Sequence, residues 1–214
     1  MEVDNYNYML DNLESNLIQE YNKVYHGGDT KLGSNYLIFE IIKKLIEDFL
    51  KKEKDAISKG NKIKIISIEE KFNKSLKING LNFPINIRGT VDRIDVYNNT
   101  LRIIDYKSGL INKSNLFFKD WKSIIKDEKK NALFQVLLYS YFYRDKRINY
   151  NEIQAGVIPF QNYDNEFIPV SLSENNIKRS VLNLNDGIFK DFEKEFFSII
   201  YEIFDQKKPF LRIR

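Results

Sequence analysis

The feature that most restricts the fold of this chain is a pair of apolar segments, residues 85–97 and 101–107, which are separated only by Asn98-Asn99-Thr100. Two such segments around a short Asn-rich turn predict an antiparallel β-hairpin. A two-residue turn at Asn98-Asn99 gives a register in which Asp92 lies opposite Asp105. Opposite side chains on one face have Cβ atoms about 4.5–5.5 Å apart, and like charges there are destabilising. The two facing carboxylates therefore need a compensating partner.

The residues around this predicted pair indicate a bound divalent cation. Because strand side chains alternate between faces, Lys107 lies on the face of Asp105, whereas Asp95 lies on the opposite face, across from Arg102. We therefore expect Asp95 to form a structural salt bridge and not to bind metal. Apolar neighbours on both faces indicate a covered hairpin, in which an unpaired charge is costly. A cation between Asp92 and Asp105 would compensate them; the alternative is that these charges line a solvent-exposed hairpin face.

Composition narrows the chemistry of such a site. The 214 residues contain no Cys and one His, which excludes disulfides, thiolate metal sites and multi-histidine metal sites. Any metal must therefore bind carboxylates and carbonyls, as Mg²⁺, Mn²⁺ and Ca²⁺ do. The net charge of +4 permits a nucleic-acid partner without identifying one. No apolar run approaches the length of a membrane span, and we expect a cytoplasmic protein with no membrane partner.

Hydrophobic periodicity predicts a single layered α/β or α+β domain over residues 1–214. Its expected parts are a helical N-terminal part (1–60), a sheet core (62–172) that includes a helix at 131–144, and closing helices (174–206). Helices are predicted at 6–25, 34–54, 131–144 and 188–205, and further strands at 62–71, 75–78, 153–160 and 167–172. Residues 110–130 are predicted to form an insertion or loop with some helix.

Three motifs together resemble a known family. Gly89-x-x-Asp-Arg-Ile-Asp95 is followed by Ile103-Ile-Asp-Tyr-Lys-Ser-Gly109, and then by Gln135 and Tyr139 at helical spacing. This series resembles the nuclease domain of RecB- and AddB-type helicase–nucleases, within the PD-(D/E)XK superfamily. The resemblance implies a restriction-endonuclease-like α/β core, with a central mixed β-sheet flanked by helices. It also implies a domain that belongs to a larger helicase–nuclease.

The resemblance assigns roles to individual residues. Asp92, Asp105 and the backbone carbonyl of Tyr106 would bind Mg²⁺ or Mn²⁺. Lys107 would orient the attacking water and stabilise negative charge on the phosphate. The family has a Glu on an earlier strand, for which Glu69 is the match and Glu70 the alternative. The helix pair, Gln135 and Tyr139, would position the DNA backbone or the catalytic lysine.

Two family features are absent from this sequence. The single histidine, His26, stands beside Gly27-Gly28 and lacks the helical context of the family's metal-binding His. The cysteines that hold an iron–sulfur cluster in many relatives are missing as well. These departures leave two hypotheses open. One is a metal-dependent deoxyribonuclease acting in double-strand break repair, with a helicase partner; the other is a catalytically weakened DNA-binding or scaffolding domain. Cleavage of RNA or of CRISPR-type intermediates is a third, weaker hypothesis.

The insertion at 110–130 offers a candidate DNA-binding surface. Lys119 and Lys122 lie next to Trp121 within a run of lysines and aromatic residues. Basic residues interleaved with aromatics suit single strands, because bases stack on the rings and phosphates pair with Lys. The alternative is a solvated face that covers a few packing aromatics.

Overall fold

The computed structural model describes residues 1–24, 30–146, 150, 152–161, 166–174, 178–207 and 209. The prediction about His26 therefore falls outside the described residues. Three helices form the N-terminal part: α1 (Val3–Asp11), α2 (Leu13–Val24) and α3 (Gly33–Ser58). The single helix predicted at 6–25 is interrupted at Asn12, whose side-chain amide donates to the Tyr8 carbonyl at 2.8 Å. Asn side chains compete in this way with the backbone bonds of a helix.

A five-stranded mixed sheet forms the centre of the fold, in the order β1-β2-β3-β5-β6. The pairings are antiparallel except between β3 and β5, which are parallel. The strands are β1 (Ile63–Leu76), β2 (Ile85–Tyr97), β3 (Thr100–Lys107), β5 (Ile153–Pro159) and β6 (Ile168–Pro169). Residues 62–71 and 75–78, predicted as separate strands, belong largely to the single strand β1. The predicted hairpin register is confirmed, since Tyr97 pairs with Thr100 and Asp95 with Arg102.

The insertion forms a small subassembly beside the main sheet. It contains η1 (Lys113–Leu116), β4 (Phe117–Phe118), α4 (Trp121–Lys126) and η2 (Glu128–Lys130). Strand β4 pairs with β7 (Ser171–Glu174), which pairs with β8 (Lys178–Val181) in a second, three-stranded sheet. The prediction of closing helices over 174–206 is therefore wrong at its start, because 178–181 pairs back onto β7. Partnering of this kind depends on a neighbouring strand and not on local periodicity.

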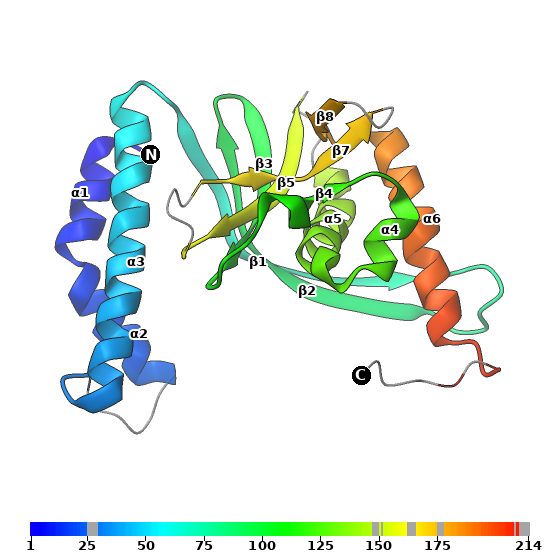
Figure 1. Cartoon of the computed structure of the whole chain (residues 1–214), viewed down its shortest axis with the longest axis horizontal. Helices are drawn as coiled ribbons and strands as arrows, with labels where there is room; N and C mark the ends of the chain where they lie inside the picture. Colours follow the sequence, from blue (N-terminus) through cyan, green and yellow to red (C-terminus); the bar gives the residue numbers. More distant parts are fainter. Residues whose placement is uncertain are drawn as a thin grey trace.

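Helices cover both faces of the central sheet (Figure 1). Helices α5 (Asn131–Tyr143) and α6 (Asp186–Ile203) pack on one face, in a core that includes Ile103 and Val157. Helices α1 and α3 pack on the other face, against Ile104 and Ile158. Short η3 (Arg144–Lys146) follows α5. This is the expected restriction-endonuclease-like α/β architecture. In the described part of the chain, none of the helices combines the length and apolar character of a membrane span.

Candidate active site

Strand β3 presents its two predicted site residues to helix α5. Ile103 lies in the core on the α5 face, and strand alternation carries Asp105 and Lys107 to the same face. The intervening residue, Tyr106, points to the other face, where its ring packs edge-on against Phe49 at 5.8 Å between centroids. The expected convergence of Asp105 and Lys107 on one face is therefore present.

Gln135 of α5 joins these two residues into one polar cluster. The Gln135 side-chain amide donates to Asp105 Oδ1 at 2.8 Å, and its carbonyl oxygen accepts from Lys107 Nζ at 2.8 Å. Lys107 Nζ also lies 2.7 Å from Asp105 Oδ2. The same Gln135 amide donates to the Tyr139 hydroxyl at 2.6 Å, one helical turn further on. Every polar group of the cluster is thus oriented by another, which fixes the position of the Lys107 ammonium.

The electrostatic state of Asp105 reflects its burial. The residue is only 3 % exposed. Burial raises the pKa of Asp105 above its ordinary value; the nearby Lys107 ammonium opposes this shift, and the Asp92 carboxylate adds to it. Burial therefore makes the ionised form of Asp105 less favourable than in water. The Asp105 carboxylate is therefore a suitable ligand for an additional cation.

Asp92 lies where strands β2 and β3 separate. The antiparallel pairing runs from Tyr97–Thr100 as far as Arg93–Ile104, and Asp92 is the next residue along β2. Its Oδ2 atom accepts a hydrogen bond from the Tyr106 backbone N–H at 2.7 Å. The carboxylate therefore lies beside the backbone of the residue whose carbonyl is the expected third ligand, and it is close enough to Asp105 to affect its pKa.

The two glutamates considered for the third acidic position differ in their surroundings. Ile68 pairs with Arg93 and Glu70 with Val91, so Glu69 occupies the place across from Asp92. Glu69 is exposed and has a φ of +52°, an unusual backbone angle for a residue with a side chain. Glu70 instead pairs with Lys146 and accepts a hydrogen bond from Ser67. The Lys146 contact lowers the pKa of Glu70.

A close aromatic contact connects this helix to the β1–β2 hairpin. The centroid of the Phe72 ring lies 5.8 Å from that of the Tyr139 ring. In the β1–β2 pairing, Phe72 lies opposite Gly89. A side chain at Gly89 would bring its Cβ within 2.6 Å of Phe72 Cζ and 3.4 Å of the Tyr139 ring. Because Gly89 has no side chain, the Phe72 ring can pack over it and contact the Tyr139 ring.

The oxygen donors of the cluster fit a hard divalent cation. Two carboxylates, Asp92 and Asp105, and the adjacent carbonyl of Tyr106 are the ligand types that Mg²⁺ and Mn²⁺ prefer. The buried Asp105 Oδ2 has its ion pair with Lys107 but no partner of full hydrogen-bond geometry. Within the described ranges, however, no three acidic or histidine side chains gather closely enough to hold a metal by themselves. Glu69 is accordingly not part of the cluster as it stands.

The residues predicted for single-strand binding lie in the insertion and make none of the hydrogen bonds of the cluster. Lys119 and Lys122 are exposed. Trp121 is half-buried, with its ring 4.9 Å from that of the buried Phe118 and against the main core. Lys130 donates to backbone carbonyls of the insertion, including that of Phe117 at 2.6 Å. The contacts of Trp121 favour the packing alternative for this aromatic residue.

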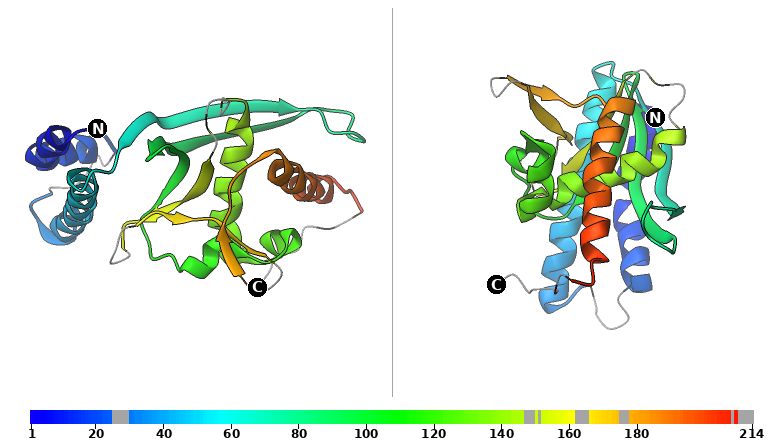
Figure 2. Two further views of the ribbon diagram at one scale, coloured as in Figure 1. Left: turned by 90° about the horizontal axis from the view of Figure 1, so that it is seen from above. Right: turned by 90° about the vertical axis from the view of Figure 1, so that its right-hand side faces the viewer.

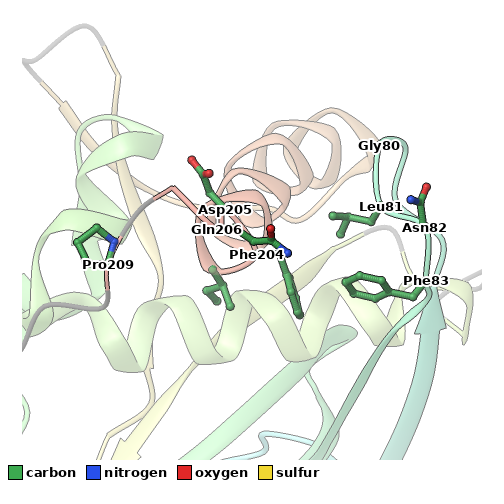
Figure 3. A pocket seen from close by; sticks show the side chains of 9 residues that line it. Gly80, Leu81, Asn82, Phe83, Phe204, Asp205, Gln206 and Pro209 are labelled. Carbon is green, nitrogen blue, oxygen red and sulfur yellow. The ribbon is translucent and has the colours of Figure 1, made fainter.

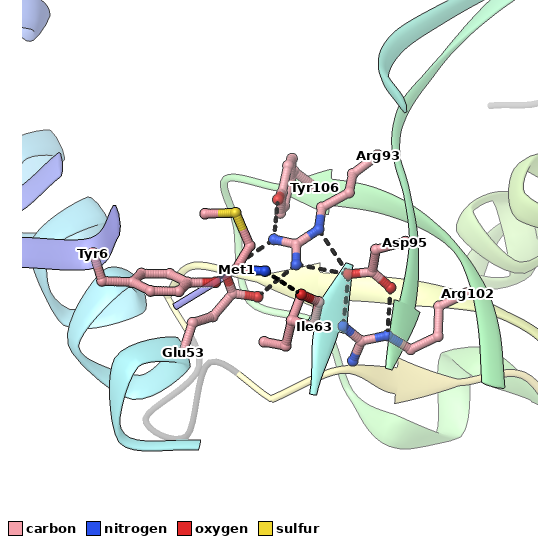
Figure 4. A network of polar contacts seen from close by, with 8 residues as sticks. All are labelled: Met1, Tyr6, Glu53, Ile63, Arg93, Asp95, Arg102 and Tyr106. Carbon is pink, nitrogen blue, oxygen red and sulfur yellow. Dashed lines mark hydrogen bonds and ion pairs between the residues drawn. The ribbon is translucent and has the colours of Figure 1, made fainter. Parts of the chain in front are cut away.

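Asp95 behaves as predicted and lies between two arginine side chains (Figure 4). Arg102 donates two hydrogen bonds to its carboxylate, at 2.8 Å and 2.7 Å, and Asp95 is fully buried. The structural salt bridge is confirmed. A second arginine, Arg93, was not predicted at this pair; its Nε donates to the same carboxylate at 2.8 Å. Its position two residues before Asp95 in one strand was the available signal.

Arg93 also ties the N-terminal helices to the sheet (Figure 4). It donates to Glu53 of α3 at 3.1 Å and to the Tyr106 hydroxyl at 3.2 Å. Tyr6 of α1 donates to the same glutamate at 3.0 Å. Burial, with the negative charge of Glu53, raises the pKa of Tyr6 well above its ordinary range. The network joins residues of α1, α3, β2 and β3. It lies on the face of β3 opposite to Asp105.

Together, the mixed sheet, its helical layers and the Asp-x-Lys pair on β3 define an α/β domain of the restriction-endonuclease-like class. The family model described as the PD-(D/E)XK nuclease superfamily matches residues 8–210. The chain belongs to this superfamily, whose members are nucleases that generally use divalent metals such as Mg²⁺. Searches of curated proteins and of solved structures gave no match.

Proposed function

We propose that this domain is a divalent-metal-dependent deoxyribonuclease of RecB/AddB type that hydrolyses phosphodiester bonds. The observation that carries the proposal is the cluster in which Gln135 holds both Asp105 and Lys107, with Asp92 on the neighbouring Tyr106 amide. A buried carboxylate next to a partly exposed lysine has little structural purpose by itself, because burial of such charges rarely adds stability.

The expected metal ligands are Asp92, Asp105 and the Tyr106 carbonyl. A bound Mg²⁺ or Mn²⁺ would polarise the scissile phosphate and lower the pKa of a coordinated water. The chain's own contribution is to hold the two carboxylates near one another at the end of the β2–β3 pairing, where the strands separate. The raised pKa of Asp105 supports this role, since its main cause is burial, which removes water from a carboxylate that a cation would stabilise.

Lys107 is the proposed catalytic lysine. Its ammonium group would orient the attacking water and stabilise negative charge on the phosphate. Gln135 would act as a positioning residue, since its carbonyl oxygen accepts from Lys107 Nζ while its amide donates to Asp105. Tyr139 would hold Gln135 in this orientation through its hydroxyl. Glu69 is proposed as a further acidic residue, which would act from its exposed position across from Asp92.

The proposed substrate is DNA, single- or double-stranded, in the context of double-strand break repair in the cytoplasm. The support is the order and spacing of the three motifs, together with the superfamily match. A helicase domain or subunit is the proposed partner on the same grounds.

A catalytically weakened DNA-binding or scaffolding domain is the second candidate. It is favoured by one observation: among the residues the structure describes, no group of three acidic or histidine side chains forms a metal site. The two candidates differ in whether the protein cleaves DNA at all.

Incubation of single- and double-stranded DNA with Mg²⁺ or Mn²⁺ separates the candidates. We expect cleavage by the parent and none by Asp105→Asn or Lys107→Ala, with Gln135→Ala reduced because Lys107 loses its acceptor. Glu69→Gln should reduce cleavage, whereas the matched change Glu70→Gln should preserve it. Cleavage that persists in Asp105→Asn would refute the proposal; a parent that binds DNA without cleaving it would favour the second candidate.

A further inference from the structure

The β1–β2 hairpin has an unusual charge distribution. Asp and Glu make up 30 of the 214 residues, so a stretch of 21 residues is expected to contain about three of them. Residues 71–91 contain none, but carry four cations, Lys71, Lys74, Lys77 and Arg88. This stretch, here called the basic hairpin, lies between Glu70 and Asp92. It therefore begins and ends beside the candidate active site.

The two faces of the basic hairpin have different environments. Phe72 and Leu76 face the main core, together with Ile85 and Ile87 of the partner strand. Lys74 lies between Phe72 and Leu76 on the same side of β1, but its side chain is exposed. The opposite face carries only polar residues, which are exposed: Lys71, Asn73, Ser75, Asn86 and Arg88. Figure 2 shows α5 and α6 on the core side of the hairpin. The polar face is thus a strand surface with hydrogen-bond donors and positive charge, and it contains no carboxylate.

The cations of the basic hairpin differ from the lysines of the helices in their ion pairing with the described residues. Lysines on the helices have such partners, for example Lys43 with Glu14 at 2.5 Å and Lys44 with Asp48 at 2.7 Å. Across the described part of the chain, none of the four hairpin cations forms an ion pair. All four side chains are exposed. Their charge is therefore available to an external polyanion.

The basic hairpin is anchored at both ends. At its tip, the Tyr201 hydroxyl of α6 donates to the Asn79 carbonyl at 2.6 Å, and the Phe83 and Phe204 rings meet at 5.2 Å. A hollow of about 580 Å³ lies between this tip and the end of α6 (Figure 3). At its base, Phe72 packs against Tyr139 of the candidate site. A surface held at both ends loses little conformational entropy on binding.

We infer that the basic hairpin binds the phosphate backbone of DNA next to the candidate active site. This inference rests on the proposed function for its substrate class. From Lys71 to Leu76 the strand extends about 17 Å, which matches the axial rise of about five nucleotides of B-form DNA. Thr90, at the base of the polar face, is two residues from Asp92. The polar face points away from α5, whereas Asp105 and Lys107 lie on the α5 face. A backbone that follows the hairpin would therefore reach β2 at Thr90 and approach the carboxylates from the edge of the sheet.

The test replaces Lys71, Lys74, Lys77 and Arg88 together by Gln. The control makes the same net change of charge at four lysines that already pair with carboxylates on α2 and α3: Lys23, Lys43, Lys44 and Lys51, each to Gln. Fluorescence anisotropy measures the Kd for a 20-base-pair duplex and for a single strand, in EDTA, at 50–200 mM salt. Thermal melts verify that both variants are folded.

We expect the hairpin variant to bind about 100-fold more weakly at 100 mM salt, with a slope of log K against log salt that is shallower by about 2 to 4. The control variant should keep the parent slope within about one unit. An equal loss in both variants, or an unchanged slope in the hairpin variant, would overturn the inference. A parent that binds neither the duplex nor the single strand would overturn it as well.

The same experiment separates this inference from the proposed function. Because binding is measured in EDTA, neither metal nor cleavage enters the measurement. If the parent fails to cleave DNA but the hairpin variant still loses affinity, the nuclease proposal fails and the DNA-binding surface stands. If cleavage occurs but the slope is unchanged, the nuclease proposal stands and the hairpin assignment fails.

Discussion

Replacing Asp105 by Asn should have opposite effects on stability with and without metal. In the metal-free protein, Asp105 is 3 % exposed, and its raised pKa shows that burial and Asp92 together outweigh the Lys107 ion pair. Asn retains an oxygen for the Gln135 amide and removes the charge. The Asp105–Lys107 ion pair, which is partly exposed at Lys107, contributes about 0.2–1 kcal/mol. Its loss opposes the gain from removing a buried charge. The variant should therefore be as stable as the parent, or more stable by about 1 kcal/mol.

The dependence of this difference on pH has a definite sign. A folded pKa raised above the unfolded value means that ionised Asp105 costs stability, and the cost is fully present above the folded pKa. As the pH falls towards the ordinary pKa of Asp, about 4, the carboxyl group becomes protonated in the folded state and the cost disappears. The advantage of the Asn variant should therefore shrink in acid. Thermal melts of both proteins across this pH range measure it.

Mn²⁺ should reverse the order of the two proteins. A ligand that binds only the folded state at 100 times its Kd stabilises it by about 2.7 kcal/mol, which raises Tm by roughly 5–10 °C for a chain of this size. The parent should show this shift and Asp105→Asn should show little of it. Asp95→Asn is the control, since it loses its buried arginine partners, at a cost of about 3–5 kcal/mol, but keeps the Mn²⁺ response. A shift lost in Asp95→Asn and kept in Asp105→Asn would refute the assignment.

Three further changes test neighbouring parts of the structure. Glu70→Gln should cost up to about 1 kcal/mol at neutral pH through its Lys146 pair. Because that contact lowers the pKa of Glu70, melts should show the difference vanishing in acid. Gly89→Ala should cost about 1–3 kcal/mol by displacing Phe72, and should slow cleavage; an unchanged Tm would contradict the packing. Trp121→Ala should lower Tm but leave single-strand affinity within about two-fold in anisotropy; a large loss of affinity would show base stacking instead.

Local patterns in the sequence were sufficient for the central part of the fold. Strand alternation and the Asn98-Asn99 turn predicted a hairpin in the observed register, with Asp95 against Arg102. Alternation also placed Asp105 and Lys107 on one face. Helical spacing placed Gln135 and Tyr139 one turn apart on α5. These predictions succeed because turn geometry and strand period are properties of a few consecutive residues.

The tertiary structure decided which of these residues meet, and in what environment. Gln135 reaches Asp105 across 30 positions of sequence only because α5 packs on that face of the sheet. The positive φ of Glu69 and the pairing of Glu70 with Lys146 depend on the path of β1. Residues of β8 form a strand through antiparallel pairing with β7, which local sequence does not encode. The sequence by itself determined the local elements and their polar residues, whereas burial, ion pairing and pKa depend on neighbours that only the packed chain brings together.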